Sequence, residues 1–426
     1  MKVLIVGCGL AGLATAISLT TKIDDVQITI VERRSKLDSR GAAFGLQISG
    51  QKALNEINGA TDGTDCDMLK TLKDKGLYIA YSGGHLFPWW VVRDALLKEV
   101  KAREDKIKIH LGVSIDDLIE QEDGSYVATF KDNELEINAD VIIGADGVHS
   151  YVRREILSLP KAKSSGAYVW RGSLDTNSSD DERMKIIQDY PLAKFLEMGG
   201  GIKLSLFNFH PKLPGQSSWV FSAQSHMLKN HVDIDCSTST PVQLIEAYMN
   251  SLDGDCDEEL KKMCDLALLV LKSTELPSDL AWSSELSVID MSAEDATWGG
   301  NGRIILIGDA AHALRPASGL GGSLAFEDAA LVARYIARSN INDSASIEEQ
   351  LRAFEKVRLP RCKSISNDQS IRSELTYKVG VECVPKMDPT YVEWINEGID
   401  ATPEPPISEM DVFGDLLSKY NLEQTI

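Results

Sequence analysis

The segment Val3-Leu4-Ile5-Val6-Gly7-Cys8-Gly9-Leu10-Ala11-Gly12 decides the fold class of this chain. Its first four residues form a short continuous apolar run, which is typical of a parallel strand buried on both faces. The glycine pattern follows at once, and residues 13–19 have helical character, so the sequence predicts a strand, a tight turn and a helix. A second predicted strand over residues 27–31 completes a βαβ unit.

Each glycine of this pattern has its own physical role in a dinucleotide-binding turn. Gly7 permits the tight turn, Gly9 lets a pyrophosphate approach the backbone, and Gly12 allows the helix to pack closely on the strand. The N-terminus of the helix then faces the negative charge of the phosphates. Glu32 follows Gly12 by twenty residues and is placed to accept hydrogen bonds from an adenosine ribose. For this motif alone, a plain strand–turn–helix without a ligand remains the alternative.

A second glycine-rich segment, late in the chain, favours FAD over NAD. Gly308-Asp309-Ala310-Ala311-His312 follows a predicted strand over residues 303–307, and Gly319-Leu320-Gly321-Gly322 begins a helix that extends to about residue 337. An NAD dehydrogenase has no evident use for this second turn. We expect Asp309 to hydrogen-bond the ribityl chain of a flavin. The second helix N-terminus is expected at the N1–C2=O edge of the ring, where negative charge collects on reduction.

Length and composition exclude several classes of protein. The chain has 426 residues, which predicts two or three domains and a sizeable core. Hydrophobic residues make up 43% and charged residues 25%, which is typical of soluble globular chains and excludes a disordered, collagen-like or disulfide-scaffold protein. The net charge of −20 argues against broad contact with nucleic acid or an anionic membrane.

Cysteine usage and the N-terminal run bear on the compartment. The seven cysteines are scattered, odd in number and without a C-x-x-C pair, which indicates free thiols and predicts no metal site. The apolar start of the chain imitates a signal peptide, but the glycine turn inside it argues for a folded βαβ unit. No uninterrupted apolar run approaches the roughly 18 residues of a membrane span. We therefore expect a cytoplasmic protein with no integral membrane span.

Between the two glycine turns the pattern of the chain changes. Alternating segments across residues 166–223 indicate a mostly antiparallel sheet, and residues 241–272 indicate two helices. Further predicted elements are a helix at 93–100, a strand at 106–111, a hairpin of 125–130 with 134–137, a strand at 140–143 and a helical stretch at 348–372. The sequence predicts an α/β fold: an FAD-binding, Rossmann-like, three-layer domain, an inserted, mostly antiparallel β-sheet substrate domain and a C-terminal helical segment.

The expected boundaries follow from these changes of pattern. The first part of the FAD-binding domain covers residues 1–155, with excursions into the substrate domain. Residues 156–298 belong mainly to the substrate-binding domain, and residues 299–345 are the second part of the FAD-binding domain. Residues 346–426 form the C-terminal helical region.

Several motifs, in a fixed order, resemble those of the FAD-dependent class A flavoprotein monooxygenases, the aromatic-hydroxylase family. The resemblance covers nearly the whole chain. It is nearest to the salicylate hydroxylase and zeaxanthin epoxidase branch, which shares Gly321-Gly322 at the end of the late glycine turn and Glu327-Asp328. Besides the opening fingerprint, the similar motifs are Glu32-Arg33-Arg34, Arg40 to Leu46, Arg93-x-x-Leu96, Gly144 to Arg153, Trp170-Arg171-Gly172 and Gly308 to Asp328.

The resemblance implies a set of site residues. Pro316 is expected to shape a rigid, dry wall near flavin C4a, and Arg171 to face the flavin cavity, with a structural pairing role as the alternative. The residues implied in cofactor binding are Gly7, Gly9, Leu10, Ala11, Gly12, Glu32, Arg33, Arg40, Ala43, Arg93, Val113, Asp146, Asp309, Gly319, Leu320, Gly321 and Gly322.

The family also implies a reaction. NADPH or NADH binds transiently and reduces the flavin. Dioxygen then adds at C4a, and the resulting hydroperoxide delivers one oxygen atom to an aromatic or alkene-containing small molecule. Two alternatives remain at this stage, an FAD-dependent reductase or dehydrogenase on the same fold and a non-catalytic flavoprotein. The expected oligomeric state is a monomer or a homodimer.

Two positions depart from the family pattern. Leu320 stands where glutamine is usual, and Ser323 occupies a position that is often asparagine. Backbone amides can still serve the flavin at this turn. The apolar Leu320 favours an apolar substrate.

Other residues receive weaker expectations. His312 is more often structural than a general base in such a position, and Arg315 either holds an anionic substrate group or faces solvent. The acidic run 253–259 is expected to cap a helix rather than to bind calcium. Tyr168, His210 and His226 are candidate polar groups of the substrate pocket.

Overall fold

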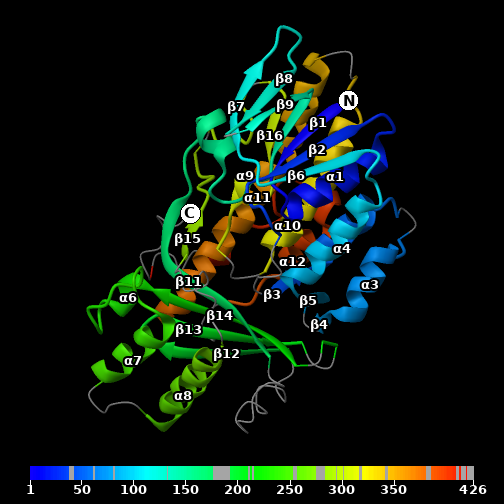
Figure 1. Ribbon diagram of the computed structural model, residues 1–426. Helices are drawn as coiled ribbons and strands as arrows, with labels where there is room; N and C mark the ends of the chain where they lie inside the picture. The colour runs from blue at the N-terminus through cyan, green and yellow to red at the C-terminus, as the bar shows by residue number, and fades with distance from the viewer. Residues whose placement is uncertain are drawn as a thin grey trace.

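The computed structural model describes most of the chain, with the parallel sheet and its helices in the upper part of Figure 1 and an antiparallel sheet in the lower part. The described residues are 1–426 without 38–42, 61–62, 80–81, 132, 176–191, 210–211, 214, 253–256, 275–283, 294, 301, 316–318, 341–343, 380–384, 409–411, 414–418 and 420–426. Arg40, His210 and Pro316 therefore lie outside the described residues.

A five-stranded parallel sheet organises the upper part, in the order β16-β10-β1-β2-β6. The apolar runs in its central strands are buried throughout, as expected for strands covered on both faces. The antiparallel sheet β7-β8-β9 packs into the same hydrophobic core as this sheet and its helices. The strands are β1 (Lys2–Val6), β2 (Gln27–Glu32), β6 (Ile107–Leu111), β10 (Val141–Gly144), β16 (Ile304–Leu306), β7 (Ile115–Glu120), β8 (Tyr126–Phe130) and β9 (Asn133–Ala139).

Two helices that follow the glycine-rich turns pack against each other. Helix α1 (Leu10–Lys22) and helix α10 (Gly321–Ile336) are buried on nearly all sides because of their many alanines and small residues. Helix α1 begins at Leu10 rather than at residue 13, because Gly9 already occupies the N-cap position. Three further helical elements of this part are α4 (Trp89–Lys101), η1 (Val152–Ile156) and α9 (Asp309–His312).

The antiparallel sheet of the lower part has the order β12-β13-β14-β11-β15. Along β13 every second side chain is buried, and these residues belong to a second hydrophobic core shared with two helices. Trp170 and Trp219 lie in this core. The elements are β11 (Lys163–Asp175), β12 (Leu192–Gly199), β13 (Ile202–Asn208), β14 (Gln216–Gln224), β15 (Ser284–Val288), α6 (Ser225–Leu228), α7 (Pro241–Ser251) and α8 (Glu258–Ser273).

A third group of elements lies beside the parallel sheet, and of these only helix α4 was predicted from the sequence. A small antiparallel sheet, β3-β5-β4, lies next to helices α2 and α3, and helix α4 begins at Trp89, four residues earlier than expected, directly after Pro88. Proline is tolerated there because the first helical residues need no intrahelical partner. The bounds are β3 (Ala43–Leu46), β4 (Leu77–Ile79), β5 (Gly84–Pro88), α2 (Ile48–Ile57) and α3 (Asp67–Lys75).

The chain closes with helices that cover α10. Helix α11 (Ser344–Val379) is longer than the predicted stretch 348–372, and α12 (Pro389–Glu397) and η3 (Gly398–Asp400) follow it. The predicted fold class is confirmed: a Rossmann-like parallel sheet, an antiparallel sheet inserted between β10 and β16 in the chain, and C-terminal helices. Among the described residues, no helix combines the length and the apolar composition that crossing a bilayer requires.

Candidate functional site

The first glycine turn contains two positions where protein packing itself requires glycine. Gly7 has a φ of 113°, and a Cβ there would collide with the backbone carbonyl of Ala145. A Cβ on Gly12 would collide with the carbonyl oxygen of Gly7. Gly7 therefore lets the turn lie close to the residue after β10, and Gly12 lets α1 lie close to the turn.

Gly9 and Gly321 differ from them, because open space lies in front of each. No described atom other than its own neighbours in the chain lies within 4 Å of the position where a Cβ would stand on either residue. The φ of Gly9 is −82°, a value open to any residue. Gly9 is the N-cap of α1, and Gly321 is the first residue of α10. One position on each turn thus leaves the room that an extended ligand would fill, with a helix N-terminus facing it.

The surroundings of the first turn carry both signs of charge. Glu32, at the end of β2, accepts hydrogen bonds from the backbone N–H of Cys8 (3.1 Å) and of Arg34 (3.0 Å). Arg93 is buried on α4, with its guanidinium 5.2 Å from the centre of the Trp89 ring. Burial raises the pKa of the Cys8 thiol to about 12; Glu32 adds to this rise and Arg93 opposes it. The charge of Arg93 therefore acts on the glycine turn, and Cys8 stays a neutral thiol.

Three further predicted residues lie shortly after strands β6, β2 and β10. Val113 is buried, and its backbone N–H donates to the carbonyl oxygen of Glu32 (2.9 Å). Arg33 is exposed. Asp146, after β10, accepts from the backbone N–H of Tyr151 (2.6 Å) and of Val152 (3.2 Å) through Oδ2, so it caps the start of η1. Part of the Asp146 carboxylate thus has a structural role.

The second glycine turn touches the first. Gly308 follows β16 with a φ of 57°, and a Cβ placed on it would lie 3.0 Å from the Cβ of Ala11. Strand β3 joins them: a Cβ on Gly45 would lie 3.4 Å from the carbonyl oxygen of Gly319. The fold therefore brings together three motifs that are far apart in the sequence.

The start of α10 packs directly on β3 and the residue after it. A Cβ on Gly322 would collide with the ring of Phe44, and the backbone N–H of Gln47 donates to Ser323 Oγ (3.0 Å). Leu320 is buried, and Ala43 is half-buried. Gln47 was not predicted as a neighbour of this turn, and only the adjacency of the Arg40 to Leu46 motif could have suggested it.

Asp309 faces Arg171 of the inserted sheet. The Asp309 side chain reaches solvent, but many protein atoms surround it and desolvate its carboxyl. This desolvation raises the pKa of the carboxyl, and the charges of His312 and Arg171 oppose the rise. Burial lowers the pKa of the Arg171 guanidinium, and the charge of Asp309 opposes that shift. The two predicted residues thus lie close enough to interact, Asp309 from helix α9 and Arg171 from strand β11.

The remaining candidates are placed less favourably for a pocket. Arg315 donates to Glu374 of α11 (3.1 Å), so its charge is already paired. Tyr168 is half-buried and His226 is exposed. Within the acidic run 253–259, Asp257 caps α8 by accepting from the backbone N–H of Leu260 (2.7 Å), which confirms the expected capping role.

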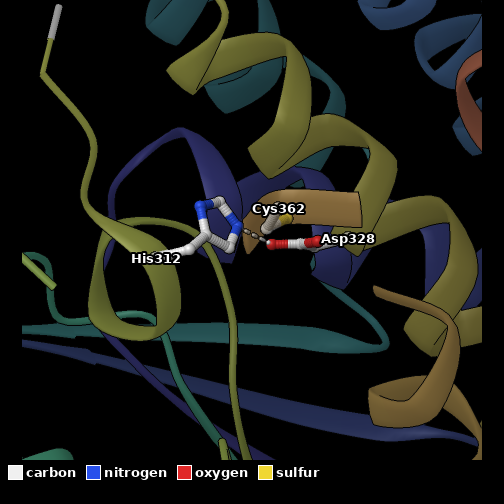
Figure 2. Close-up of side chains that lie close together, drawn as sticks. All are labelled: His312, Asp328 and Cys362. Atoms are coloured by element: carbon white, nitrogen blue, oxygen red, sulfur yellow. Dashed lines mark hydrogen bonds and ion pairs between the residues drawn. The ribbon is translucent and has the colours of Figure 1, made fainter. Parts of the chain in front are cut away.

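A buried polar cluster lies next to Asp309, and His312, for which the sequence favoured a structural role, belongs to it. His312, Asp328 and Cys362 point toward one another from α9, α10 and α11, and all three are fully buried (Figure 2). Their ligand atoms lie within 4.8 Å of one another, which is a spacing that a metal ion could use. The Arg358 guanidinium, however, donates to Asp328 Oδ1 (2.8 Å) and lies 3.6 Å from Cys362 Sγ. The Arg358 guanidinium therefore already supplies the positive charge that a metal ion would bring to this cluster.

Comparisons with known proteins agree with this geometry. Residues 240–368 match a family model described as an FAD binding domain. The chain is 26% identical to asperlicin C monooxygenase of Petromyces alliaceus, over 85% of this chain and 77% of that one. It is also 26% identical to 2-heptyl-3-hydroxy-4(1H)-quinolone synthase of Pseudomonas aeruginosa, over 78% of this chain and 80% of that one.

Solved structures share the fold. The crystal structure of CtdE in complex with FAD and its substrate 4 superposes with a TM-score of 0.71 at 17% identity, covering 100% of both chains. Klebsiella pneumoniae HpxO complexed with FAD and uric acid gives a TM-score of 0.65 at 18% identity, over 95% of this chain and 97% of that one. Together with the matching domain and the monooxygenase relatives, the converging glycine turns support a class A flavoprotein monooxygenase, the family that the sequence motifs resemble.

Proposed function

We propose that FAD lies extended between the two glycine turns. The observation that carries this proposal is the open space in front of Gly9 and Gly321, where neither the backbone conformation of Gly9 nor a described side chain accounts for glycine. The pyrophosphate would lie at the N-terminus of α1, and the flavin ring at the N-terminus of α10. Both helix ends direct partial positive charge at groups that carry or acquire negative charge.

Individual side chains would hold parts of the cofactor. Glu32 would accept hydrogen bonds from the adenosine ribose, since each of its oxygens has a second lone pair beyond the backbone bond it already takes. Asp309 would bind the ribityl chain. The charge of Arg93 would balance the phosphates. Beside these we keep the residues implied by the family motifs: Gly7, Leu10, Ala11, Gly12, Arg33, Arg40, Ala43, Val113, Asp146, Gly319, Leu320 and Gly322.

The reaction that we propose uses NADPH or NADH and O2. When bound, the flavin supplies hydride acceptance and oxygen activation, which amino acid side chains do not provide. The protein would orient the substrate and keep water out. Arg171 would place a positive charge beside Asp309 at the ring, and Pro316, which has no backbone N–H, would form part of the dry wall.

The proposed substrate is a small or medium apolar molecule with an aromatic ring or an alkene. The buried Leu320 at the second turn supports this class, because an apolar wall favours an apolar neighbour. A relative named above agrees with the ring part of this class, since it is named for a quinolone, which is an unsaturated ring compound. Membership of the salicylate hydroxylase and zeaxanthin epoxidase branch stays a prediction.

Two measurements test the proposal in order. The visible spectrum of the purified protein, with FAD added if needed, should contain the bands of oxidised protein-bound flavin. A substrate screen should then follow NADPH and O2 together, and a true substrate should accelerate consumption of both. NADPH turnover without O2 consumption would indicate a reductase instead. Bound FAD without oxidation of NADPH or of NADH for any substrate would contradict the proposed reductant.

A further inference from the structure

The carboxylate of Asp328 holds both ends of the turn that presents Asp309. Its Oδ2 accepts a hydrogen bond from the backbone N–H of Gly308 (2.8 Å). The same oxygen lies 2.6 Å from His312 Nε2 (Figure 2). Its Oδ1 accepts a hydrogen bond from Arg358 Nε (2.8 Å). Asp328 and His312 are both fully buried, so water does not compete for these bonds. One side chain of α10 thus fixes the residue before α9 and the last residue of α9.

The bonds of this carboxylate are charge-assisted. Burial alone would raise the pKa of Asp328, but the charges of His312 and Arg358 outweigh burial and lower it to about 2. Burial disfavours the charged ring of His312, yet the neighbouring Cys362 and Asp328 hold its pKa well above the ordinary value. A charged pair makes shorter and stronger hydrogen bonds than a neutral one.

Asp309 lies between the two fixed points. Helix α9 is a single turn, closed by bonds from the N–H groups of Ala311 and His312 to the carbonyl oxygen of Gly308 (both 2.9 Å). Ala310 and Ala311 are buried, whereas the Asp309 side chain is exposed. Because the backbone on both sides is held by Asp328, the direction of the Asp309 side chain is set by that anchor.

We propose that Asp328, acting through Gly308 and His312, is the positioning residue that aims the Asp309 carboxylate at bound FAD. The inference rests on the proposed FAD site. The same cluster is not assigned to a metal ion, because Arg358 already supplies the positive charge next to Asp328 and Cys362. Asp328 is expected to act on the flavin only through the turn.

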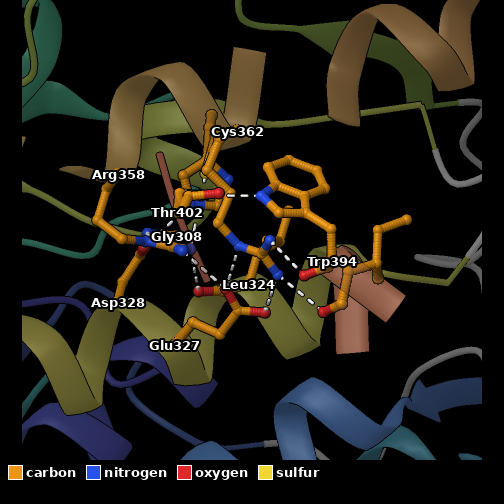
Figure 3. A network of polar contacts seen from close by, with 11 residues as sticks. Gly308, Leu324, Glu327, Asp328, Arg358, Cys362, Trp394 and Thr402 are labelled. Carbon is orange, nitrogen blue, oxygen red and sulfur yellow. Dashed lines mark hydrogen bonds and ion pairs between the residues drawn. The ribbon is translucent and has the colours of Figure 1, made fainter. Parts of the chain in front are cut away.

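The neighbouring residue Glu327 provides a matched control. It is equally buried on the same helix. Its carboxylate accepts a hydrogen bond from Arg358 Nη1 (2.7 Å), which lies beside it in Figure 3. It also accepts one from Arg361 Nε (2.9 Å). Arg361 also donates to the carbonyl oxygens of Trp394 and Ile395, so Glu327 ties α10 to the C-terminal helices. No bond from Glu327 to the Gly308–His312 segment exists among the described residues. The two neighbours thus share burial and ion pairing but differ in contact with α9.

The experiment compares Asp328→Asn with Glu327→Gln in the full-length protein. Both variants are expected to lose stability in urea unfolding without FAD, because each breaks a buried charge network. Asp328→Asn is expected to raise the FAD dissociation constant at least about tenfold more than Glu327→Gln does. At saturating FAD it should also change the visible absorption and circular dichroism of the flavin, while the Glu327→Gln spectra should superimpose on those of the wild type.

A second pair of variants decides the matter if Asp328→Asn does not fold. His312→Gln keeps an N–H donor at the position of Nε2, whereas His312→Leu removes it, and both lose the charge. FAD affinity near the wild-type value in the Gln variant with a loss in the Leu variant supports the anchor, and equal values in the two overturn it. Equal effects of Asp328→Asn and Glu327→Gln on FAD would overturn this inference alone, whereas a wild-type protein that bound no FAD would overturn the proposed site as well.

Discussion

Among single residues, Gly9 is a position where a substitution should change FAD affinity without changing the free energy of unfolding. The space in front of it and its ordinary φ mean that this chain gains nothing from glycine there. Threonine is about as good an N-cap as glycine, so Gly9→Thr should change the free energy of unfolding of the FAD-free protein by less than about 0.5 kcal/mol. It should weaken FAD binding by about tenfold or more, because its side chain occupies the path of the pyrophosphate. Urea unfolding and fluorescence titration with FAD measure the two effects.

Gly12→Ala is the contrasting variant in the same turn. Its Cβ would meet the carbonyl oxygen of Gly7, so the FAD-free protein should lose roughly 1–3 kcal/mol of stability. A Gly9→Thr variant as unstable as Gly12→Ala, or one that binds FAD like the wild type, would show that the turn serves packing alone.

Asp309 carries a second prediction about a single residue, and its pH dependence has a definite sign. Desolvation by the surrounding protein raises the pKa of the Asp309 carboxyl in the folded protein, so its ionisation lowers folding stability. The cost is absent below the carboxyl's ordinary pKa and complete above the raised one. Asp309→Asn should therefore make the FAD-free protein more stable at neutral pH, with no gain in strong acid, while FAD affinity falls by about tenfold. Thermal unfolding across pH and FAD titration measure this, and a loss of stability at neutral pH would contradict it.

At the scale of the element, a shared carboxylate joins the helices next to the parallel sheet. Glu56 of α2 contacts Lys22 Nζ of α1 (2.9 Å) and Arg334 Nε of α10 (3.0 Å). Burial alone would raise its pKa, but the hydrogen bonds from Arg334 and Lys22 outweigh burial and lower it. A lowered carboxyl pKa gives stability that is present above the ordinary pKa and is lost as the pH falls through the lowered one.

Glu56→Gln should therefore cost about 1–2 kcal/mol of unfolding free energy at neutral pH. The difference from the wild type should shrink as the pH falls from the ordinary carboxyl pKa through the lowered pKa of Glu56. Lys262→Gln is a suitable control, because it breaks an exposed pair with Glu258 and should cost less than about 0.5 kcal/mol. Urea unfolding at a series of pH values tests this, and a cost that does not vary with pH would show that the charge of Glu56 is irrelevant.

The elements differ in how well the sequence predicts them. The central strands of the parallel sheet are predicted because burial on both faces leaves an uninterrupted apolar run, as in Val3–Val6. The edge strand β6 is predicted from its alternation instead. Helix α3 and the sheet β3-β5-β4 are not predicted, since they are short and their apolar residues follow neither helical nor strand periodicity over enough residues. The glycine turns are predicted because backbone geometry restricts the residue type. The anchor at Asp328 could not be, because its bonds join residues of α10, α9 and α11 that only the tertiary fold brings together.

At the scale of the whole molecule, the two sheets have separate hydrophobic cores. The first core includes β1, β10 and β16, and the second includes β13 and β14 with α7 and α8. The division into domains at residues 155, 298 and 345 stays a proposal, although the insertion of the antiparallel strands between β10 and β16 agrees with it. Such an arrangement has a consequence for ligand binding. A molecule held between the ends of β1 and β16 stabilises the first core directly.

Hydrogen exchange can detect that selectivity. At an FAD concentration of one hundred times the dissociation constant, binding adds about 2.7 kcal/mol to the stability of the structure that holds it, which slows opening-dependent exchange by up to about a hundredfold. Peptides covering residues 1–22 and 302–313 should both slow by this amount, whereas peptides from β13 should slow much less. Slowing in only one of the first two peptides would mean that FAD rests on one turn alone. Equal slowing in β13 would mean that the two cores unfold together, and Gly9→Thr should abolish whatever FAD protects.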